Sequence, residues 1–270
     1  MSNFITSDGI RLYYEEKGEG KPIVFIHGWT ADHTVFNPQV EALSSEFKVV
    51  TYDLRGHGES DRPDKGLTLK RFATDLRELI EHLNLNDVIV VGWSMGASII
   101  FEYVKNFGVQ YLSKVCILDM TPKLINDDSW KLGLNHGTFT TKDTFDALTV
   151  MCNNWMDFAK EFAADALPYL NEEQLIPIFE GLEKNSPHVM YSMWIAMSAN
   201  DYRDVLENIT VPTYIVYGEK STLYSKETAE YMNSKIPNSK VVPFENCTHF
   251  LVIENPEKLS KVVKELSTFN

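Results

Sequence analysis

The chain has 270 residues, enough for one large domain or two small ones with a sizeable hydrophobic core. Its net charge of −13 argues against nucleic acid and anionic membrane surfaces as partners, because both are bound through basic patches. No apolar run reaches the roughly 20 residues that span a bilayer, and the N-terminus does not resemble a signal peptide. Three widely spaced cysteines without a CxxC pair indicate reduced thiols and a cytoplasmic protein.

Buried strands are predicted wherever the chain has a continuous apolar, β-branched run. In chain order these runs fall within residues 10–18, 22–28, 47–60, 87–94, 115–122, 211–218 and 239–246. Helical spacing of apolar residues alternates with them, over 34–46, 69–85, 96–107, 225–235 and 255–269. Strands covered on both faces and separated by helices are typical of an α/β protein with a mostly parallel sheet.

One region interrupts this alternation. From about residue 123 to 204 there is no clear strand, and amphipathic helical patterns occupy 144–167, 171–182 and 188–202. We therefore expect a core domain formed by residues 1–122 and 205–270. Residues 123–204 are predicted to form a helical cap inserted into it.

The strand over 87–94 runs directly into the sequence Gly-Trp-Ser-Met-Gly, with Ser94 at its centre. A strand that enters a helix through Gly-x-Ser-x-Gly predicts a nucleophile elbow, in which the serine lies on a tight, strained turn. Bulky residues two positions away would clash there, which explains the glycines. The Ser94 hydroxyl is then expected at the carboxyl end of the sheet, above a helix N-terminus that favours negative charge.

A serine hydroxyl needs a base to act as a nucleophile near neutral pH. Of the seven histidines, His249 follows the last strand and precedes the last helix, which suits the chain order serine, acid, histidine. His27 and His57 are expected to shape loops. No cluster of His, Cys and Asp has metal-ligand spacing, so we expect neither a metal nor another cofactor. Backbone N–H groups of Trp29 and Met95 are predicted to form the oxyanion hole.

Four segments together resemble one family. They are FIHGW (25–29), YDLRGHGES (52–60), VVGWSMGAS (90–98) and CTHFLVIENPEKL (247–259). They resemble the α/β-hydrolase superfamily, in its branch of bacterial esterases and cofactor-free haloperoxidases (perhydrolases), over almost the whole chain. The resemblance implies an eight-stranded sheet, a helical cap after strand six and a Ser-His-acid triad. A serine at the elbow, where dehalogenases and epoxide hydrolases of this fold carry aspartate, implies acyl transfer to water.

The triad acid departs from the family pattern. Most relatives place an aspartate after strand seven, where this chain has Ser221. Two replacements are available: Asp119, at the end of strand six, where some relatives carry the acid, and Glu219, two residues earlier in the same loop. We favour Asp119, because a residue at a strand end is held more rigidly and the acid must fix the imidazole tautomer.

The predicted cap is rich in large apolar residues, of which Trp155, Met193, Trp194 and Met197 are expected to line the substrate pocket. The sequence thus predicts a serine hydrolase for carboxylic esters of small to medium apolar acyl groups, with perhydrolysis as a side reaction and a small-molecule ester as its partner. The alternative is a ligand-sensing or stress-signalling protein of the same fold with slow or vestigial hydrolysis, which the missing usual acid leaves open.

Overall fold

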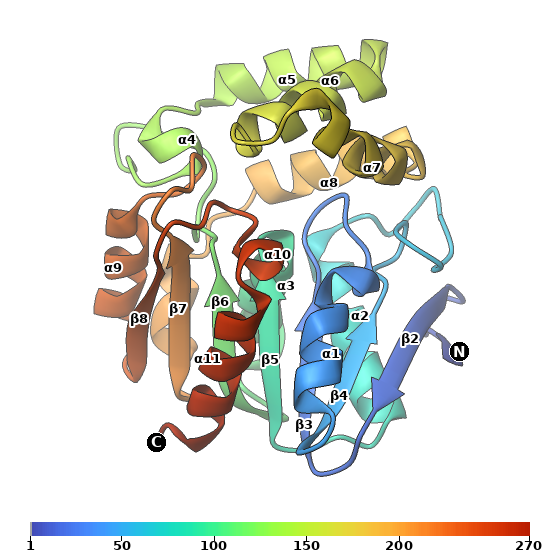
Figure 1. Ribbon diagram of the computed structural model, residues 1–270, viewed down its shortest axis with the longest axis vertical. Coiled ribbons are helices and arrows are strands. Elements are labelled where there is room, and N and C mark those ends of the chain that lie inside the picture. Colours follow the sequence, from blue (N-terminus) through green and yellow to red (C-terminus); the bar gives the residue numbers. More distant parts are fainter. Residues whose placement is uncertain (1) are drawn as a thin grey trace.

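The computed structural model describes residues 2–270, and its centre is one sheet of eight strands (Figure 1). The strand order is β1-β2-β4-β3-β5-β6-β7-β8. The six strands from β4 to β8 in this order pair in parallel, whereas β2 is antiparallel to both β1 and β4. The strands are β1 (Ser2–Ile5), β2 (Arg11–Lys17), β3 (Lys21–Ile26), β4 (Phe47–Tyr52), β5 (Val88–Trp93), β6 (Leu112–Leu118), β7 (Thr213–Gly218) and β8 (Ser239–Phe244).

The predicted strands are confirmed, and β1 is added to the seven that apolar runs revealed. The sequence of β1, Ser2–Ile5, carries no apolar run, because Phe4 is the one side chain that this strand buries. Along the central strands alternate residues belong to separate cores: Val24 and Ile26 to one, Ile23 and Phe25 to the other. Apolar residues on both faces explain why these strands read as continuous hydrophobic runs.

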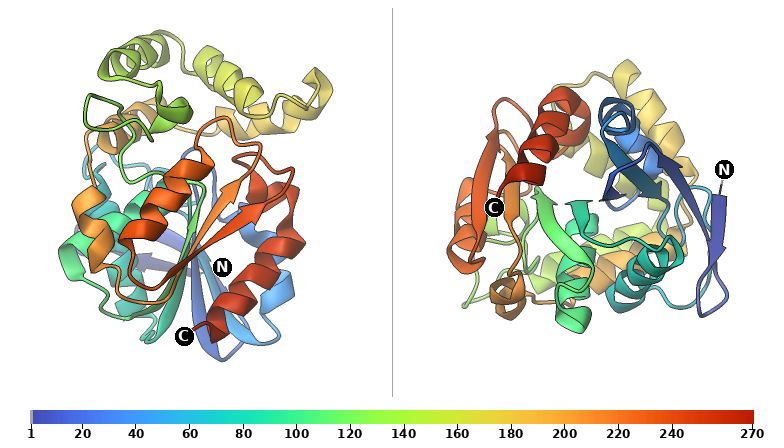
Figure 2. Two further views of the ribbon diagram at one scale, coloured as in Figure 1. Left: turned by 90° about the vertical axis from the view of Figure 1, so that its left-hand side faces the viewer. Right: turned by 90° about the horizontal axis from the view of Figure 1, so that it is seen from below.

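Helices cover both faces of the sheet (Figure 2). On one face α1 packs against α11, and on the other α2 packs against α3. The helices of this core are α1 (Asn37–Leu43), α2 (Leu69–His82), α3 (Met95–Phe107), α9 (Lys226–Lys235), α10 (Leu251–Glu254) and α11 (Pro256–Thr268), with 3₁₀ turns η1 (His33–Phe36) and η2 (Arg203–Asn208). The five predicted core helices are therefore present. No helix of residues 2–270 has the length and apolar character needed to cross a membrane.

The α-helices α4 to α8 lie between β6 and β7 in the chain, and α5 to α8 form a layer above the sheet in Figure 1. They are α4 (Leu134–Gly137), α5 (Thr141–Asn153), α6 (Trp155–Ala166), α7 (Glu172–Glu183) and α8 (Pro187–Ser198). The helical pattern over 144–167 is divided between α5 and α6. Asn154 leaves helical geometry (φ −153°, ψ 96°) and its side chain accepts a hydrogen bond from the Asp157 amide, so it caps the second helix.

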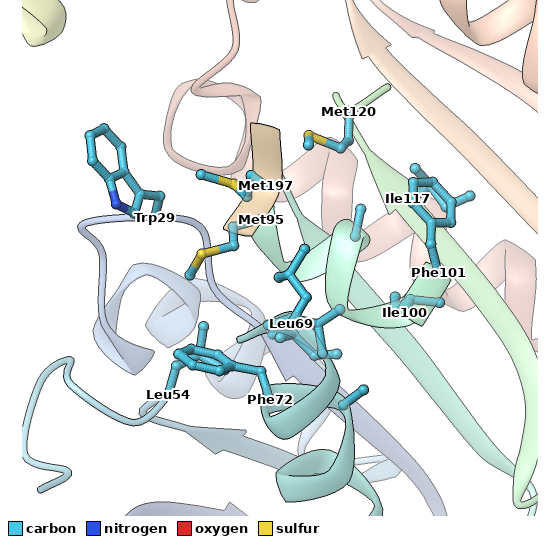
Figure 3. Close-up of a cluster of buried hydrophobic side chains, with 14 of the residues drawn as sticks. Trp29, Leu54, Leu69, Phe72, Met95, Ile100, Phe101, Ile117, Met120 and Met197 are labelled. Atoms are coloured by element: carbon cyan, nitrogen blue, oxygen red, sulfur yellow. The ribbon is translucent and has the colours of Figure 1, made fainter. Parts of the chain in front are cut away.

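The larger hydrophobic core continues from the sheet into these helices. Figure 3 shows Leu69 and Phe72 of α2 below Met95, with Met197 of α8 and Trp29 beyond it. All five side chains are buried. The helices above the sheet therefore share one apolar core with it.

Candidate active site

Ser94 lies on a sharp turn between β5 and α3, with φ 54° and ψ −120°. A positive φ is strained for a residue with a side chain and is often found at functional sites. The flanking glycines make the turn possible. A Cβ on Gly96 would stand 2.2 Å from the Ile26 carbonyl oxygen, and one on Gly92 would stand 2.6 Å from the Gly96 carbonyl. The predicted elbow geometry is thus present.

His249 lies in the loop between β8 and α10, where two hydrogen bonds hold it, one at its ring and one at its backbone. Its Nδ1 is 2.7 Å from Asp119 Oδ2, and the indole N–H of Trp93 donates to its backbone carbonyl over 2.9 Å. The His249 and Asp119 side chains are both buried. With Nδ1 donating to the Asp119 carboxylate, Nε2 is the ring nitrogen that carries no proton and can act as an acceptor.

Asp119 directly follows β6 and has a φ of 45°. Its Oδ1 accepts a hydrogen bond from the Gly218 amide at 3.1 Å, and its Oδ2 accepts from the Ser221 hydroxyl at 2.8 Å. Ser221 is the residue that stands where the family pattern expects an aspartate. The loop after β7 therefore does reach the site, but it brings a hydroxyl donor to the carboxylate and not a second carboxylate.

Glu219, the alternative acid, lies elsewhere. Its side chain is exposed, and its backbone N–H donates to the Phe244 carbonyl. Within residues 2–270 its carboxylate makes no hydrogen bond with His249. A strand-end aspartate is positioned by the sheet itself, and this geometry places Asp119, not Glu219, against the imidazole.

The two predicted oxyanion donors lie beside Ser94. Met95 is the first residue of α3, where backbone N–H groups have no partner in the helix and the helix dipole favours negative charge. A Cβ on Gly28 would stand 3.2 Å from the Ser94 Cβ, which places the start of the Trp29 loop against the elbow. In the described chain neither the Trp29 nor the Met95 amide donates to a protein acceptor. Both remain available for an oxyanion.

The Trp29 side chain connects this loop to the helices above the sheet. Its indole N–H donates to the Met190 carbonyl of α8 over 3.1 Å. Its ring lies 5.2 Å from that of Trp194 and 5.6 Å from that of Trp155, measured between centroids. Aromatic pairs at these separations are favourable, so the loop that carries Trp29 is packed directly against α6 and α8.

Ser94 and His249 line one small cavity of about 80 Å³. Three of the predicted pocket residues line it: Trp155, Trp194 and Met197. Met193 does not. Its side chain is fully buried in the hydrophobic core, so its size and apolar character serve packing. No charged side chain of residues 2–270 lines the cavity.

Sequence reasoning missed several wall residues. Ala159, Phe162 and Ala163 of α6 line the cavity, and they lie on the same face of that helix as the predicted Trp155. Their spacing of three and four residues was visible in the sequence, with small alanines leaving room between aromatic rings. Ile178 and Leu182 also line the cavity and lie four residues apart on α7, where the sequence predicted a helix. Others come from segments whose sequence gave no such signal: Leu124, Leu134, Leu223, Tyr224 and Phe250.

His27 and His57 have the structural roles that the sequence indicated. His27 accepts a hydrogen bond from the Leu54 amide at Nε2 (3.0 Å), and its Nδ1 is 2.8 Å from the Gly28 carbonyl. His57 Nδ1 donates to the Arg55 carbonyl over 3.1 Å. Burial lowers the pKa of both imidazoles, that of His57 to about 3. Both rings are neutral at pH 7 and hold the loops next to the oxyanion donors.

One group of possible metal ligands does come together, although the sequence spacing did not suggest it. Asp32, His33 and Asp53 place their ligand atoms within 4.8 Å of one another. Asp53 is already used by protein donors: its Oδ1 accepts from the His33 amide and faces His33 Nδ1, and its Oδ2 accepts from the Glu59 amide. The group therefore fits a hydrogen-bond cluster that shapes these loops.

Comparison with known proteins agrees with this geometry. Residues 21–256 match the family model of the alpha/beta hydrolase fold. The chain is 28% identical to the AB hydrolase superfamily protein YisY of Bacillus subtilis, over 99% of both chains. It superimposes on an esterase from Exiguobacterium antarcticum with a TM-score of 0.90 and 29% identity, over 99% of both chains. For a bromoperoxidase from Bacillus anthracis the TM-score is 0.87 and the identity 28%, over 98% of this chain and 99% of that one.

The family match covers most of the chain, and the similar structures extend over nearly all of it. The fold, the elbow and the strand order agree with this assignment. The chain belongs to the α/β-hydrolase family, in the branch of esterases and haloperoxidases, and is a hydrolase.

Proposed function

We propose that this protein is a serine hydrolase that cleaves carboxylic esters of small apolar acyl groups through an acyl-enzyme. One observation carries the proposal. Ser94, on a strained elbow, lines the same cavity as His249, whose Nδ1 is bonded to the buried Asp119 carboxylate. A nucleophile, a base and an orienting acid in this relation are what acyl transfer needs.

In this mechanism His249 Nε2 takes the proton of the Ser94 hydroxyl as its oxygen attacks the ester carbonyl. The tetrahedral oxyanion is held by the amides of Trp29 and Met95, which face the charge that develops in the transition state. His249 then returns the proton to the leaving alcohol. Water, activated by the same imidazole, releases the acid from Ser94. Asp119 holds the ring in orientation and stabilises the imidazolium.

The substrate class follows from the cavity. Its walls are apolar and aromatic, and none of the described wall residues is charged. A carboxylate or phosphate on the acyl group would lose its hydration there without gaining a partner, which is costly. The small volume of about 80 Å³ favours short acyl chains. Hydrogen peroxide in place of water at the second step would give perhydrolysis at the same residues.

We also propose that residues 123–204 act as a cap over this site. Helices α6, α7 and α8 supply wall residues to the cavity, and Trp29 packs against two of them. The alternative of a signalling protein with vestigial hydrolysis depended on a missing triad acid. The contact between Asp119 and His249 supplies a carboxylate at the required position, which supports the enzyme.

The proposal is tested by hydrolysis of p-nitrophenyl esters of increasing acyl length, from acetate to decanoate. We expect turnover with an optimum at short chains and a loss of at least about 10⁴-fold in kcat for Ser94→Ala. Ser98→Ala, which removes a buried hydroxyl one turn along the same helix, is the matched control and should stay active. Wild type no faster than Ser94→Ala on every ester would refute the esterase function.

A further inference from the structure

We propose that Ser221 is a positioning residue of this site, which holds Asp119 toward His249 and ties the triad to the cavity wall. The inference rests on the proposed function. It concerns a residue at the position where a carboxylate was expected and a hydroxyl is found. The three contacts of that hydroxyl carry the argument.

The first contact is with the triad acid. Ser221 Oγ lies 2.8 Å from Asp119 Oδ2, the same oxygen that accepts from His249 Nδ1 at 2.7 Å. The Gly218 amide donates to the other oxygen. With donors on both oxygens the carboxylate cannot rotate without breaking a charge-assisted hydrogen bond. The hydroxyl also takes up part of the negative charge of the oxygen that faces the imidazole. It therefore reduces how strongly that oxygen stabilises the protonated ring.

The other contacts fix the direction of the hydroxyl. Ser221 Oγ accepts hydrogen bonds from the amides of Leu223 and Tyr224, both over 3.3 Å. Because two N–H groups point at its lone pairs, its single hydrogen is directed to Asp119. The side chains of Leu223 and Tyr224 both line the cavity. One buried hydroxyl therefore joins the acid to the wall that contacts the acyl group.

The backbone of Ser221 is held as firmly as its side chain. Its amide donates to the Gly218 carbonyl over 3.0 Å, and its carbonyl lies 2.7 Å from Nε2 of His136, in α4. A serine that only shaped the loop would need the two amide contacts alone. The bond to Asp119 is the part that loop shaping does not require, and it predicts an effect on the chemistry of His249.

Kinetics separate these two roles. Ser221→Ala should lower kcat about 10-fold with KM within about twofold, since the lost bond orients the acid and does not touch the substrate. With more charge left on Asp119 Oδ2, protonated His249 is favoured, so the acidic limb of the kcat/KM profile should move to higher pH. Ser221→Thr keeps the hydroxyl and should restore both. Ser225→Ala, a serine of the same loop that contacts Thr228, is the control and should behave as wild type.

A second readout does not depend on any ester. The proton on His249 Nδ1 should give a far-downfield proton NMR signal, assigned by its loss in His249→Gln. In Ser221→Ala this signal should shift and titrate at a higher pH, and in Ser221→Thr it should return. If Ser221→Ala does not fold, Ser221→Cys, a weaker donor of similar size, should give an intermediate shift.

Two results would overturn the proposal: a wild-type NMR titration in Ser221→Ala, or a loss of kcat with an unmoved pH profile that Ser221→Thr fails to restore. The outcome is distinguishable from failure of the proposed function. If wild type and Ser94→Ala hydrolyse every ester equally, the esterase function fails, while the NMR titration still decides whether Ser221 acts on the Asp119–His249 pair.

Discussion

The sheet and the helices α5–α8 above it differ in how completely their apolar side chains are buried. Strands β5 and β7 are buried at every residue, from Val88 to Trp93 and from Thr213 to Gly218. By contrast, of the seven exposed large apolar side chains among residues 2–270, five lie in the segment from α5 to α8: Phe145, Val150, Tyr169, Ile176 and Ile195. The apolar side chains of the sheet are buried in the core, whereas those of the upper helices partly line the cavity and partly lie on the surface.

The two regions also differ in what sets their geometry, which is the backbone at the sheet edge and the side chains in the upper helices. At the sheet edge, backbone geometry positions the groups of the proposed triad: Ser94 and Asp119 both have a positive φ directly after a strand. In the upper helices, side-chain size decides the shape of the cavity, as with Phe162 and Ala163 on α6. Substitutions at the sheet edge should therefore change rate, and substitutions in α6–α8 should change specificity.

The largest effect is expected at the sheet edge. Asp119→Asn should lower kcat by about 10³ to 10⁴-fold, because the amide favours the wrong imidazole tautomer while the shape is kept. Steady-state kinetics on the best p-nitrophenyl ester would measure this, with thermal melting as the check on folding. Glu219→Gln, two residues from Ser221 but exposed, should remain near wild type. The opposite pattern in the two variants would identify Glu219 as the acid.

A smaller effect is expected on the stability of the loops beside the site. Burial lowers the pKa of His57 to about 3, whereas an imidazole in the unfolded chain titrates near 6.5. Below pH 6.5 the unfolded chain therefore binds a proton that the folded chain does not. The contribution of His57 to the free energy of unfolding is therefore fully present above about pH 6.5 and is lost as the pH falls toward 3. The loss reaches about 2 kcal/mol by pH 5.

Urea denaturation at pH 7 and pH 5 would measure this loss. His57→Gln cannot take up the proton, so its free energy of unfolding should fall less between the two pH values, whatever its stability at pH 7. His82→Gln, on an exposed helix position, should keep the wild-type difference. Equal differences in wild type and His57→Gln would show that the buried imidazole does not set the acid sensitivity.

The smallest effect is expected in the upper helices and should change substrate preference. Phe162→Ala removes an aromatic wall of the cavity and should move the acyl-length optimum to longer chains. We expect the kcat/KM ratio of long to short esters to rise about 10-fold, the scale set by a few methylene groups. Phe145→Ala, on the exposed face of neighbouring α5, should leave the optimum unchanged. An unmoved optimum in Phe162→Ala would place the acyl group elsewhere.

Local sequence patterns were sufficient to predict the strands and helices of the core and the turn at Ser94. The glycines around Ser94 and the apolar strand before it specify the elbow, because only small residues permit that turn. His249 was identified by its place after the last strand. Pocket residues were harder to predict: Met193 is as large and apolar as Met197 and lies on the same helix, yet only Met197 lines the cavity.

The sequence by itself determined the alternation of strands and helices, the turn at Ser94 and the choice of His249 as the proposed base, because each depends on residues close together in the chain. Only the tertiary structure decided which acid faces His249. Asp119 and Ser221 are separated by 102 positions and meet because β6 and β7 are parallel neighbours whose carboxyl ends share one edge. Contacts of that kind depend on strand order and register, which no local pattern of residues specifies.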